Sequence, residues 1–256
     1  MNILEKITAA TRERVELEKK NPLPQSAALP RPPFLFEERL RKSEMSFICE
    51  VKKASPSKGI IAEDFPYLNI AKEYEQAGAD AISVLTEPKF FLGHYSYLSE
   101  IREKVNIPLL RKDFIIDIFQ IEQSANLGAD AILLICAILS PAQLSEYIAA
   151  ANELGLSCLV ETHDETELEI ALEANAKIVG VNNRNLKTFE VDTGNSIRLR
   201  KLVPADVLFV SESGISTADD VELLRVNGVN AVLVGETLMR AQDKSAALAK
   251  LRGGKN

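Results

Sequence analysis

Charged and amide side chains stand at the carboxyl ends of several apolar segments, where the core of a protein would favour valine, isoleucine and leucine. These residues are Glu50 and Lys52, Lys112, Glu161, and Asn182 with Arg184. Ammonium and carboxylate groups held together in a partly desolvated site can act as general acids and bases. We expect burial beside another cation to lower the pKa of such a lysine, and burial to raise the pKa of a glutamate. The structural alternative is an ion-pair network that only closes the protein, and it explains single residues better than the whole set.

Two glycine-containing turns point to an anion site. Ser213 and Gly214 follow one apolar segment, Gly235 and Glu236 follow the next, and each turn precedes a predicted helix. Backbone N–H groups at a helix N-terminus bind phosphate, and glycine lets the chain approach its ligand closely. A tight turn would explain either glycine alone, but two neighbouring turns favour a phosphate site. The loop 55–59 is a further candidate for anion contact, with a solvated loop as the alternative.

Eight short apolar segments alternate with stretches of helical periodicity from residue 46 onward. The segments are 47–52, 81–86, 108–114, 131–137, 158–162, 178–182, 208–213 and 231–235. Their nearly continuous hydrophobicity is typical of parallel strands covered on both faces. Eight such units predict an α/β fold, a closed (β/α)8 TIM barrel. The alternative, an open dinucleotide-binding sheet, is not favoured, because no Gly-x-Gly-x-x-Gly motif follows the first strand. Active sites of this barrel lie at the carboxyl ends of the strands, so the polar residues above are expected to meet there.

A short motif recurs directly before three of these segments. Residues 78–81 and 128–131 both read Gly-Ala-Asp-Ala, and residues 228–231 read Gly-Val-Asn-Ala, at intervals of 50 and 100 residues. These intervals are multiples of one βα unit, which indicates an internal repeat. The glycine is predicted to end the preceding helix in a left-handed conformation.

Residues 1–45 precede the repeat and are predicted to be an N-terminal helical extension, with residues 46–256 as the catalytic barrel. Ile3, Leu4 and Ile7 give a helical apolar stripe, five prolines follow between residues 22 and 33, and a helical pattern resumes at 34–41. A plug under the barrel, an arm in solvent and a lid over the active face all agree with this periodicity. Our hypothesis is that the extension covers the substrate.

Composition excludes several classes of protein. With 256 residues, 46% of them hydrophobic and 26% charged, the chain is an ordinary globular protein, and a net charge of −7 argues against a nucleic-acid binder. The N-terminus lacks a secretory signal and no run is long and apolar enough for a membrane span, so we expect a cytoplasmic protein without membrane contact. Cys49, Cys136 and Cys158 are predicted to be buried and reduced. The two histidines, His94 and His163, lie far apart and predict no metal site.

Six stretches of the chain resemble the indole-3-glycerol phosphate synthase family. They are EVKKASPSKG at 50–59, LRKDFI around Lys112, LVET around Glu161, VNNRNL around Arg184, SESGI around Ser213 and LVGETLMR around Gly235. The resemblance spans essentially the whole chain, including the N-terminal extension. It implies closure of the indole ring of 1-(2-carboxyphenylamino)-1-deoxyribulose 5-phosphate, with loss of CO2 and water, in tryptophan biosynthesis. It implies no metal and no organic cofactor.

The resemblance also implies roles for individual residues. Lys112 would be the general acid that protonates the ribulose carbonyl, Glu161 the acid or base of a later dehydration, and Glu50 with Lys52 a coupled pair at the reacting centre. Substrate would be held and oriented by Asn182, Arg184 and Ser55. The pocket for the aromatic ring would be formed by Phe91, Phe114, Leu133, Leu186 and Leu233, and the phosphate would be bound by Ser213, Gly214, Gly235 and the backbone amide of Glu236. Asn185 stands where many members have aspartate, next to Arg184.

An acidic protein must hold a substrate with a carboxylate and a phosphate through local cations. The candidates at or beyond strand ends are Lys52, Lys53, Lys58, Lys112 and Arg184. We expect a small-molecule substrate as the partner, no nucleic acid or membrane, and a monomer, with a weak homodimer as the alternative. Two other functions stay open from the residues alone. They are another phosphosugar barrel, such as a Schiff-base aldolase or a phosphoribosylanthranilate isomerase-like protein, and a binder of phosphorylated ligands without catalysis.

Overall fold

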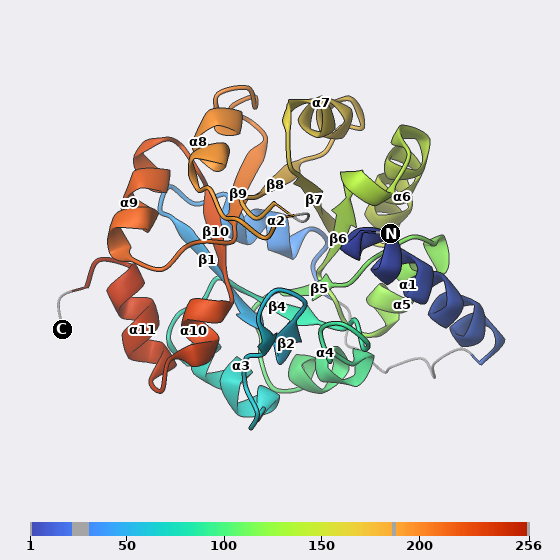
Figure 1. The fold of residues 1–256 in the computed structure, drawn as a ribbon, viewed down its shortest axis with the longest axis horizontal. Coiled ribbons are helices and arrows are strands. Elements are labelled where there is room, and N and C mark those ends of the chain that lie inside the picture. The colour runs from blue at the N-terminus through green and yellow to red at the C-terminus, as the bar shows by residue number, and fades with distance from the viewer. Residues whose placement is uncertain (1, 22–30, 186–187, 255–256) are drawn as a thin grey trace.

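A computed structural model describes residues 2–21, 31–185 and 188–254, and within these ranges eight parallel strands close into a barrel surrounded by helices (Figure 1). The strands follow the chain around the barrel, and the first, β1, pairs with both β4 and the last strand, β10. They are β1 (Ser46–Val51), β4 (Ala81–Leu85), β5 (Leu109–Lys112), β6 (Ala131–Ile135), β7 (Ser157–Thr162), β8 (Ile178–Asn182), β9 (Leu208–Glu212) and β10 (Ala231–Val234). The predicted (β/α)8 TIM barrel is confirmed.

The helices lie outside the barrel or at its ends. They are α1 (Ile3–Lys20), α2 (Leu35–Leu40), α3 (Tyr67–Gln76), α4 (Tyr95–Arg102), α5 (Ile118–Asn126), α6 (Pro141–Glu153), α7 (Glu165–Glu173), α8 (Gly194–Arg200), α9 (Ala218–Val226), α10 (Glu236–Arg240) and α11 (Lys244–Leu251). Strand ends lie within two residues of the predicted ones, and the strand 178–182 matches at both ends. The segment 131–137 leaves the strand at Ile135 and continues as a 3-10 turn, η1 (Cys136–Ile138). A small hairpin in the loop after β1, β2 (Ala54–Ser55) with β3 (Gly59–Ile60), was not predicted, since two-residue strands have no periodicity.

Each strand divides its side chains between two apolar layers, because successive residues point to opposite faces. In β1, Phe47, Cys49 and Val51 pack outward against the helices, whereas Ile48 joins the cluster inside the barrel. Glu50, two residues after Ile48, therefore points to the interior. The three cysteines are buried and free, as predicted.

The repeated motif closes the amino end of the barrel. The side chain of its third residue accepts a hydrogen bond from the backbone N–H of a neighbouring strand: Asp80 from Phe47 at 2.9 Å, Asp130 from Leu109 at 2.8 Å and Asn230 from Phe209 at 2.9 Å. The motif glycines have φ of +83°, +83° and +80°, the left-handed conformation predicted for them. The sequence repeat is thus a repeated way of ending a helix and fixing the next strand.

The N-terminal extension covers both ends of the barrel. Helix α2 plugs the amino end, where Phe36 and Leu40 are fully buried in the interior cluster and the backbone N–H of Glu37 donates to Ser157 Oγ at the start of β7. Helix α1 lies on the other side, against α5, where Ile3 and Leu4 border the opening at the carboxyl ends. The plug and the lid are both present, in different helices.

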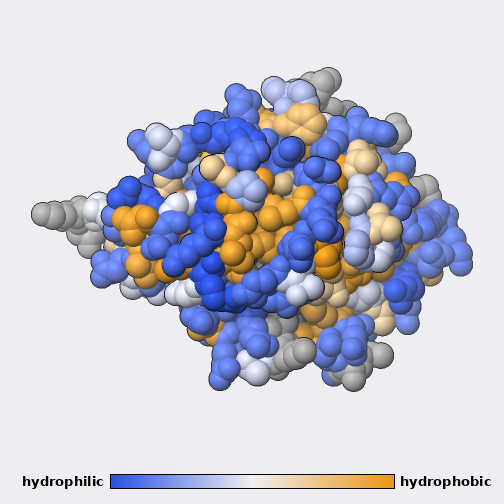
Figure 2. Space-filling view, turned by 90° about the horizontal axis from the view of Figure 1, so that it is seen from above, coloured by the Kyte–Doolittle hydropathy of each residue, from blue (hydrophilic) through white to orange (hydrophobic). Residues whose placement is uncertain are grey.

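Figure 2 shows a face on which hydrophilic side chains dominate, with apolar areas among them near the middle of the view. None of the helices within the described ranges has the length and apolar composition needed to cross a membrane.

Candidate active site

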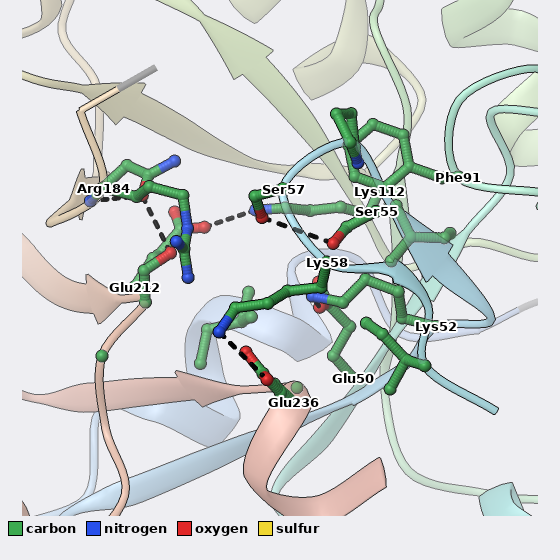
Figure 3. Close-up of a pocket in the computed structure, with 18 of the residues that line it drawn as sticks. Glu50, Lys52, Ser55, Ser57, Lys58, Phe91, Lys112, Arg184, Glu212 and Glu236 are labelled. Carbon is green, nitrogen blue, oxygen red and sulfur yellow. Dashed lines mark hydrogen bonds and ion pairs between the residues drawn. The ribbon is translucent and has the colours of Figure 1, made fainter. Parts of the chain in front are cut away.

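A cavity of about 630 Å³ opens at the carboxyl ends of the strands. It brings together every predicted site residue that the structure describes, from all eight βα units. These are Glu50, Lys52, Ser55, Phe91, Lys112, Phe114, Leu133, Glu161, Asn182, Arg184, Ser213, Gly214, Leu233, Gly235 and Glu236. Leu186, predicted for the ring pocket, lies outside the described residues. Figure 3 shows the charged side chains converging on this cavity from opposite walls.

Lys112 is the cation at the centre of the cavity. It ends β5 and points inward, while its neighbours Arg111 and Asp113 point outward. Its Nζ donates to Glu212 and lies 3.5 Å from Oε2 of Glu161. Burial lowers the pKa of Lys112, but the charges of Glu212, Glu161 and Glu50 outweigh it and raise the pKa above its ordinary value. The expectation that crowding by cations lowers the pKa of a lysine here is wrong, because the close neighbours of Lys112 are carboxylates.

Glu212 lies within the predicted strand 208–213 and the SESGI stretch, and no role was predicted for it. It ends β9, it is buried, and burial with the nearby charges of Glu161 and Glu50 raises its pKa to about 7, although Lys112 opposes this. Its Oε1 is buried without a hydrogen-bond partner among the described residues. The expected glutamate with a raised pKa is therefore present, and it is Glu212. Glu212 and its partner Lys112 are 100 positions apart in the sequence, so no local pattern connects them. The position of Glu212 at the end of a strand was the one available signal.

Glu50 and Lys52 form an ion pair beside Gly235. Residues two apart on a strand share a face, which explains why this pair forms. A Cβ atom at position 235 would collide with Glu50 Oε1 and crowd Lys52 Nζ. Gly235 therefore leaves the space that the pair occupies, in addition to its predicted place in a phosphate turn.

A hydrogen-bond network fixes the wall formed by β7 to β9. Asn182 Nδ2 donates to Glu161 Oε1 at 3.3 Å, and Asn182 Oδ1 accepts from Ser213 Oγ and from the backbone N–H of Arg184, each at 3.0 Å. The guanidinium of Arg184 donates to the Phe189 carbonyl at 3.1 Å. Within the same loop, Asn185 Oδ1 accepts from the backbone N–H of Thr188 at 3.2 Å, so the asparagine at this position contributes to the loop that carries Arg184.

The two predicted phosphate turns border the same side of the cavity. Ser213 and Gly214 have φ of +70° and +84°, and a left-handed serine is a strained conformation of the kind found at binding sites. Lys58, from the loop after β1, reaches across to Glu236 at 3.3 Å (Figure 3). Of the five predicted cations, Lys53 is the one that does not line the cavity among the described residues.

The opposite wall is apolar. The rings of Phe91 and Phe114 have centroids 6.1 Å apart, and Leu133 and Leu233 lie deeper in the barrel. Glu87 holds the loop of Phe91 by accepting hydrogen bonds from three successive backbone N–H groups, at residues 89–91. Helix α1 completes this wall with Ile3, Leu4 and Ile7, the apolar stripe noted in the sequence.

An ion pair holds α1 beside Lys112. Arg14 donates to both carboxylate oxygens of Asp113, at 3.1 and 2.8 Å, and Asp113 also accepts from Thr86 and Arg111. Burial raises the pKa of Asp113, but Arg14 and Arg111 outweigh it and lower the pKa to about 2. The lid is therefore anchored to the residue that follows Lys112 in the chain.

No three His, Cys, Asp or Glu side chains lie close enough to share a metal ion in the described part of the chain. The arrangement instead combines a cation held between carboxylates, an apolar slot and two glycine turns. Such a site can transfer protons to and from an aromatic, anionic substrate.

Comparisons with known proteins agree with this chemistry. A family model for indole-3-glycerol phosphate synthase matches residues 4–251. The indole-3-glycerol phosphate synthase of Ruminiclostridium cellulolyticum is 60% identical over 98% of this chain and 99% of its own, and that of Endomicrobium trichonymphae is 56% identical over 98% and 99%. Among solved structures, 3-hexulose-6-phosphate synthase from Salmonella typhimurium aligns with a TM-score of 0.67 at 18% identity, covering 82% of this chain and 97% of that one, which supports the barrel fold alone.

Proposed function

The chain belongs to the indole-3-glycerol phosphate synthase family, and we propose that the cavity at the carboxyl ends of its strands is the catalytic site. The enzyme is a carboxy-lyase of tryptophan biosynthesis. It closes the indole ring of 1-(2-carboxyphenylamino)-1-deoxyribulose 5-phosphate and releases CO2 and water. The observation that carries the site assignment is Lys112, a partly buried cation between Glu161 and Glu212 that faces both an apolar wall and the glycine turns.

The substrate binds with its two ends on different walls. The phosphate accepts hydrogen bonds at the turns of Ser213–Gly214 and Gly235–Glu236, with Lys58 nearby, while the aromatic ring packs against Phe91 and Phe114. Helix α1 covers the ring side and excludes water there, which strengthens the electrostatic interactions inside the cavity. Arg184, with Ser55 across the cavity, orients the sugar chain and the carboxylate.

Ring closure is the step that uses Lys112. The ring carbon that bears the carboxylate attacks the ribulose carbonyl carbon, a C–C bond forms, and the carbonyl oxygen takes a proton from Lys112 Nζ. A lysine whose pKa is raised keeps its proton until an alkoxide, a stronger base than an amine, develops beside it. The C–CO2 bond then breaks, and its electron pair returns to the ring as CO2 leaves.

Dehydration follows on the same ring. The new hydroxyl leaves as water with a proton from Glu161, and the adjacent ring carbon loses a proton to Glu50, which Lys52 holds in place. Two protons are given and one is taken, so each turnover consumes one proton overall. Asn182 keeps Glu161 turned toward the hydroxyl.

The test follows product fluorescence. The chain has no tryptophan, so an indole signal that rises when the substrate is added comes from the product. We expect Lys112→Ala to remove turnover with the fold retained by circular dichroism, and Glu161→Gln to slow the late step. Near-normal turnover by Lys112→Ala would refute the assignment.

Borohydride treatment with substrate distinguishes an aldolase, which would form a covalent adduct at Lys52 or Lys112, from the proposed enzyme, which would not. Calorimetric binding without product would indicate a binder.

We propose that the enzyme acts as a monomer, with a weak homodimer as the alternative. Size-exclusion chromatography with light scattering at assay concentration tests this, and a dimer that loses activity on dilution would refute it. The three free, buried cysteines support work in the reducing cytoplasm.

A further inference from the structure

His163 lies between the active-site cavity and a second cavity of about 550 Å³. The second cavity opens beside β7 and β8, and it shares Leu4, Asn182 and Arg184 with the first. The roles proposed above do not use it. It is lined mainly by polar residues, among them Asp164, Glu167, Glu190, Asp192 and Arg198.

The imidazole of His163 is held at one nitrogen and directed toward the active site with the other. Nδ1 lies 2.9 Å from Glu167 Oε2, and the backbone N–H of His163 donates to the same oxygen at 2.8 Å. Nε2 is buried, has no hydrogen-bond partner among the described residues, and lies 3.5 Å from Glu161 Oε1. A carboxylate that fixes one imidazole nitrogen orients the other for proton transfer.

The surroundings of His163 favour its protonated form. Burial lowers the pKa of His163, but the hydrogen bond to Glu167 and the charges of Glu161, Glu167 and Glu212 outweigh it and raise the pKa above its ordinary value. The ionisable groups around the ring come from every neighbouring element. The carboxylates are Glu161 on β7, Asp164 and Glu167 at the start of α7, and Glu212 on β9, and the cations are Arg184 after β8 and Arg198 on α8. Cys136 on η1 stays neutral, because burial raises its pKa to about 12. Carboxylates predominate, so the surroundings stabilise the imidazolium.

The proposed reaction requires a supply of protons at this place. One proton is consumed in each turnover, and the proton that Glu161 gives to the leaving hydroxyl must be replaced before the next cycle. Among the other neighbours of Glu161, Lys112 does not line the second cavity, and Asn182 lines it but carries an amide that is not an acid. His163 both lines the second cavity and has an ionisable side chain.

We propose that His163 relays a proton from the second cavity to Glu161, an inference that rests on the function proposed above. The imidazolium gives its Nε2 proton to Glu161 Oε1, the N–H bond breaks as the O–H bond forms, and the neutral ring keeps its Nδ1 proton on Glu167. A hydronium ion or a buffer acid in the second cavity then returns a proton to Nε2 as the ring turns toward it. His163 is thus a positioning residue that acts through Glu161 and does not touch substrate.

The test compares the same substitution at the two histidines of the chain. His163→Asn keeps a polar group near Glu167 but removes the nitrogen that reaches Glu161. We expect kcat to fall about 10-fold in dilute buffer with KM unchanged, and added imidazole to restore it, because a small acid can enter the second cavity. The kcat of this variant should also fall as the concentration of buffer acid falls. His94→Asn is the matched control, since His94 is exposed, caps α4, and asparagine is a good N-cap; it should keep wild-type kinetics.

Two results would overturn the relay. One is wild-type kcat for His163→Asn at every pH and buffer concentration. The other is a loss of activity that imidazole does not restore and that accompanies a lower melting temperature, which would indicate a structural role. If wild type and His94→Asn themselves fail to make the indole product, the proposed function is wrong, and the two failures are thereby distinguished.

A measurement without turnover tests the coupling directly. In His94→Asn the imidazole of His163 is the single one in the chain, so its NMR titration needs no assignment. Replacing the Glu161 carboxylate, in Glu161→Gln on this background, should lower the pKa of His163, because a nearby negative charge is removed. An unchanged pKa would show that the two groups do not interact and would overturn the relay.

Discussion

Charged groups are buried at both ends of the barrel, and the two ends differ in how completely these groups are paired. At the amino end, Asp130 accepts hydrogen bonds from Arg31 at 2.5 Å, Arg102 at 3.0 Å and the backbone N–H of Leu109 at 2.8 Å. At the carboxyl end, Glu212 Oε1 and His163 Nε2 are buried without a hydrogen-bond partner among the described residues. An ionisable side chain with an unpaired buried atom costs stability, and these two lie beside the cavity, where ligand binding or proton transfer can complete their pairing.

The same contrast governs protonation. Burial and the charge of Arg31 lower the pKa of Arg102 to about 10, yet this side chain stays charged at neutral pH. The pKa of Glu212, raised to about 7 by burial, falls where small changes in its surroundings alter its protonation. The amino end therefore holds constant charges that fix the strands, and the carboxyl end holds a charge that can change during a reaction.

The largest expected effect is a loss of catalysis without a loss of fold. Lys112→Met should lower kcat by about 10³-fold or more, since it removes the proposed acid of the first step. Its effect on melting temperature should be small, because methionine fills the space and Glu212, left without its cation, can take up a proton. Stopped-flow indole fluorescence and a thermal melt measure the two quantities. Lys104→Met, on the surface after α4, is the control, and an equal loss there would invalidate the comparison.

The opposite pattern is expected at the amino end. Asp130→Ala should lower the free energy of unfolding by about 3 kcal/mol, because it leaves a buried backbone N–H and two partly buried guanidinium groups without this acceptor. The kcat of the folded fraction should stay at the wild-type value. Urea unfolding at pH 7 measures the loss. Asp130→Asn should cost less, since Asn230 makes the equivalent backbone contact in the third copy of the motif. A large fall in kcat would mean that the two ends are not independent.

Glu212 predicts a pH dependence of stability. Its pKa is about 7 in the folded protein against 4.5 when unperturbed, so the folded state binds the proton more tightly than the unfolded chain does. The resulting stability is fully present below pH 4.5 and is lost as the pH rises through 7, by up to about 3 kcal/mol. Glu212→Gln should therefore flatten the decline in unfolding free energy between pH 5 and pH 8. Glu169→Gln, at an exposed position on α7, should leave the decline as it is. An equal slope in all three proteins would contradict the raised pKa.

Local pattern was sufficient for the strands, the repeated motif and the polar residues that end the strands, whereas the roles of individual residues came from the family resemblance and stay predictions. A strand-end position such as Lys112 or Asn182 is visible in one segment, and the barrel brings all strand ends together. The sign of the pKa shift at Lys112 was not predictable in this way, because it depends on which charges from β7 and β9 face the lysine. The role of Glu212 was missed for the same reason. Helix α1 looked like a lid, a plug or a solvated arm because its amphipathic stripe does not identify the surface it covers.

The smallest expected effect concerns this lid. Leu4 and Leu17 are both apolar residues of α1, but Leu4 borders the cavity whereas the side chain of Leu17 is 64% exposed. Leu4→Ala should raise KM several-fold, equivalent to about 1 kcal/mol, because it removes apolar contact with the aromatic ring of the substrate while burying little in the free enzyme. Leu17→Ala should leave KM and melting temperature unchanged. Phe36→Ala, in the plug α2, should instead lower the free energy of unfolding and leave KM unchanged, since it creates a void at the end far from the substrate. Equal KM values for the Leu4 and Leu17 variants would mean that α1 stabilises the barrel but does not cover the substrate, and the carboxyl end would then bind its ligand without help from the extension.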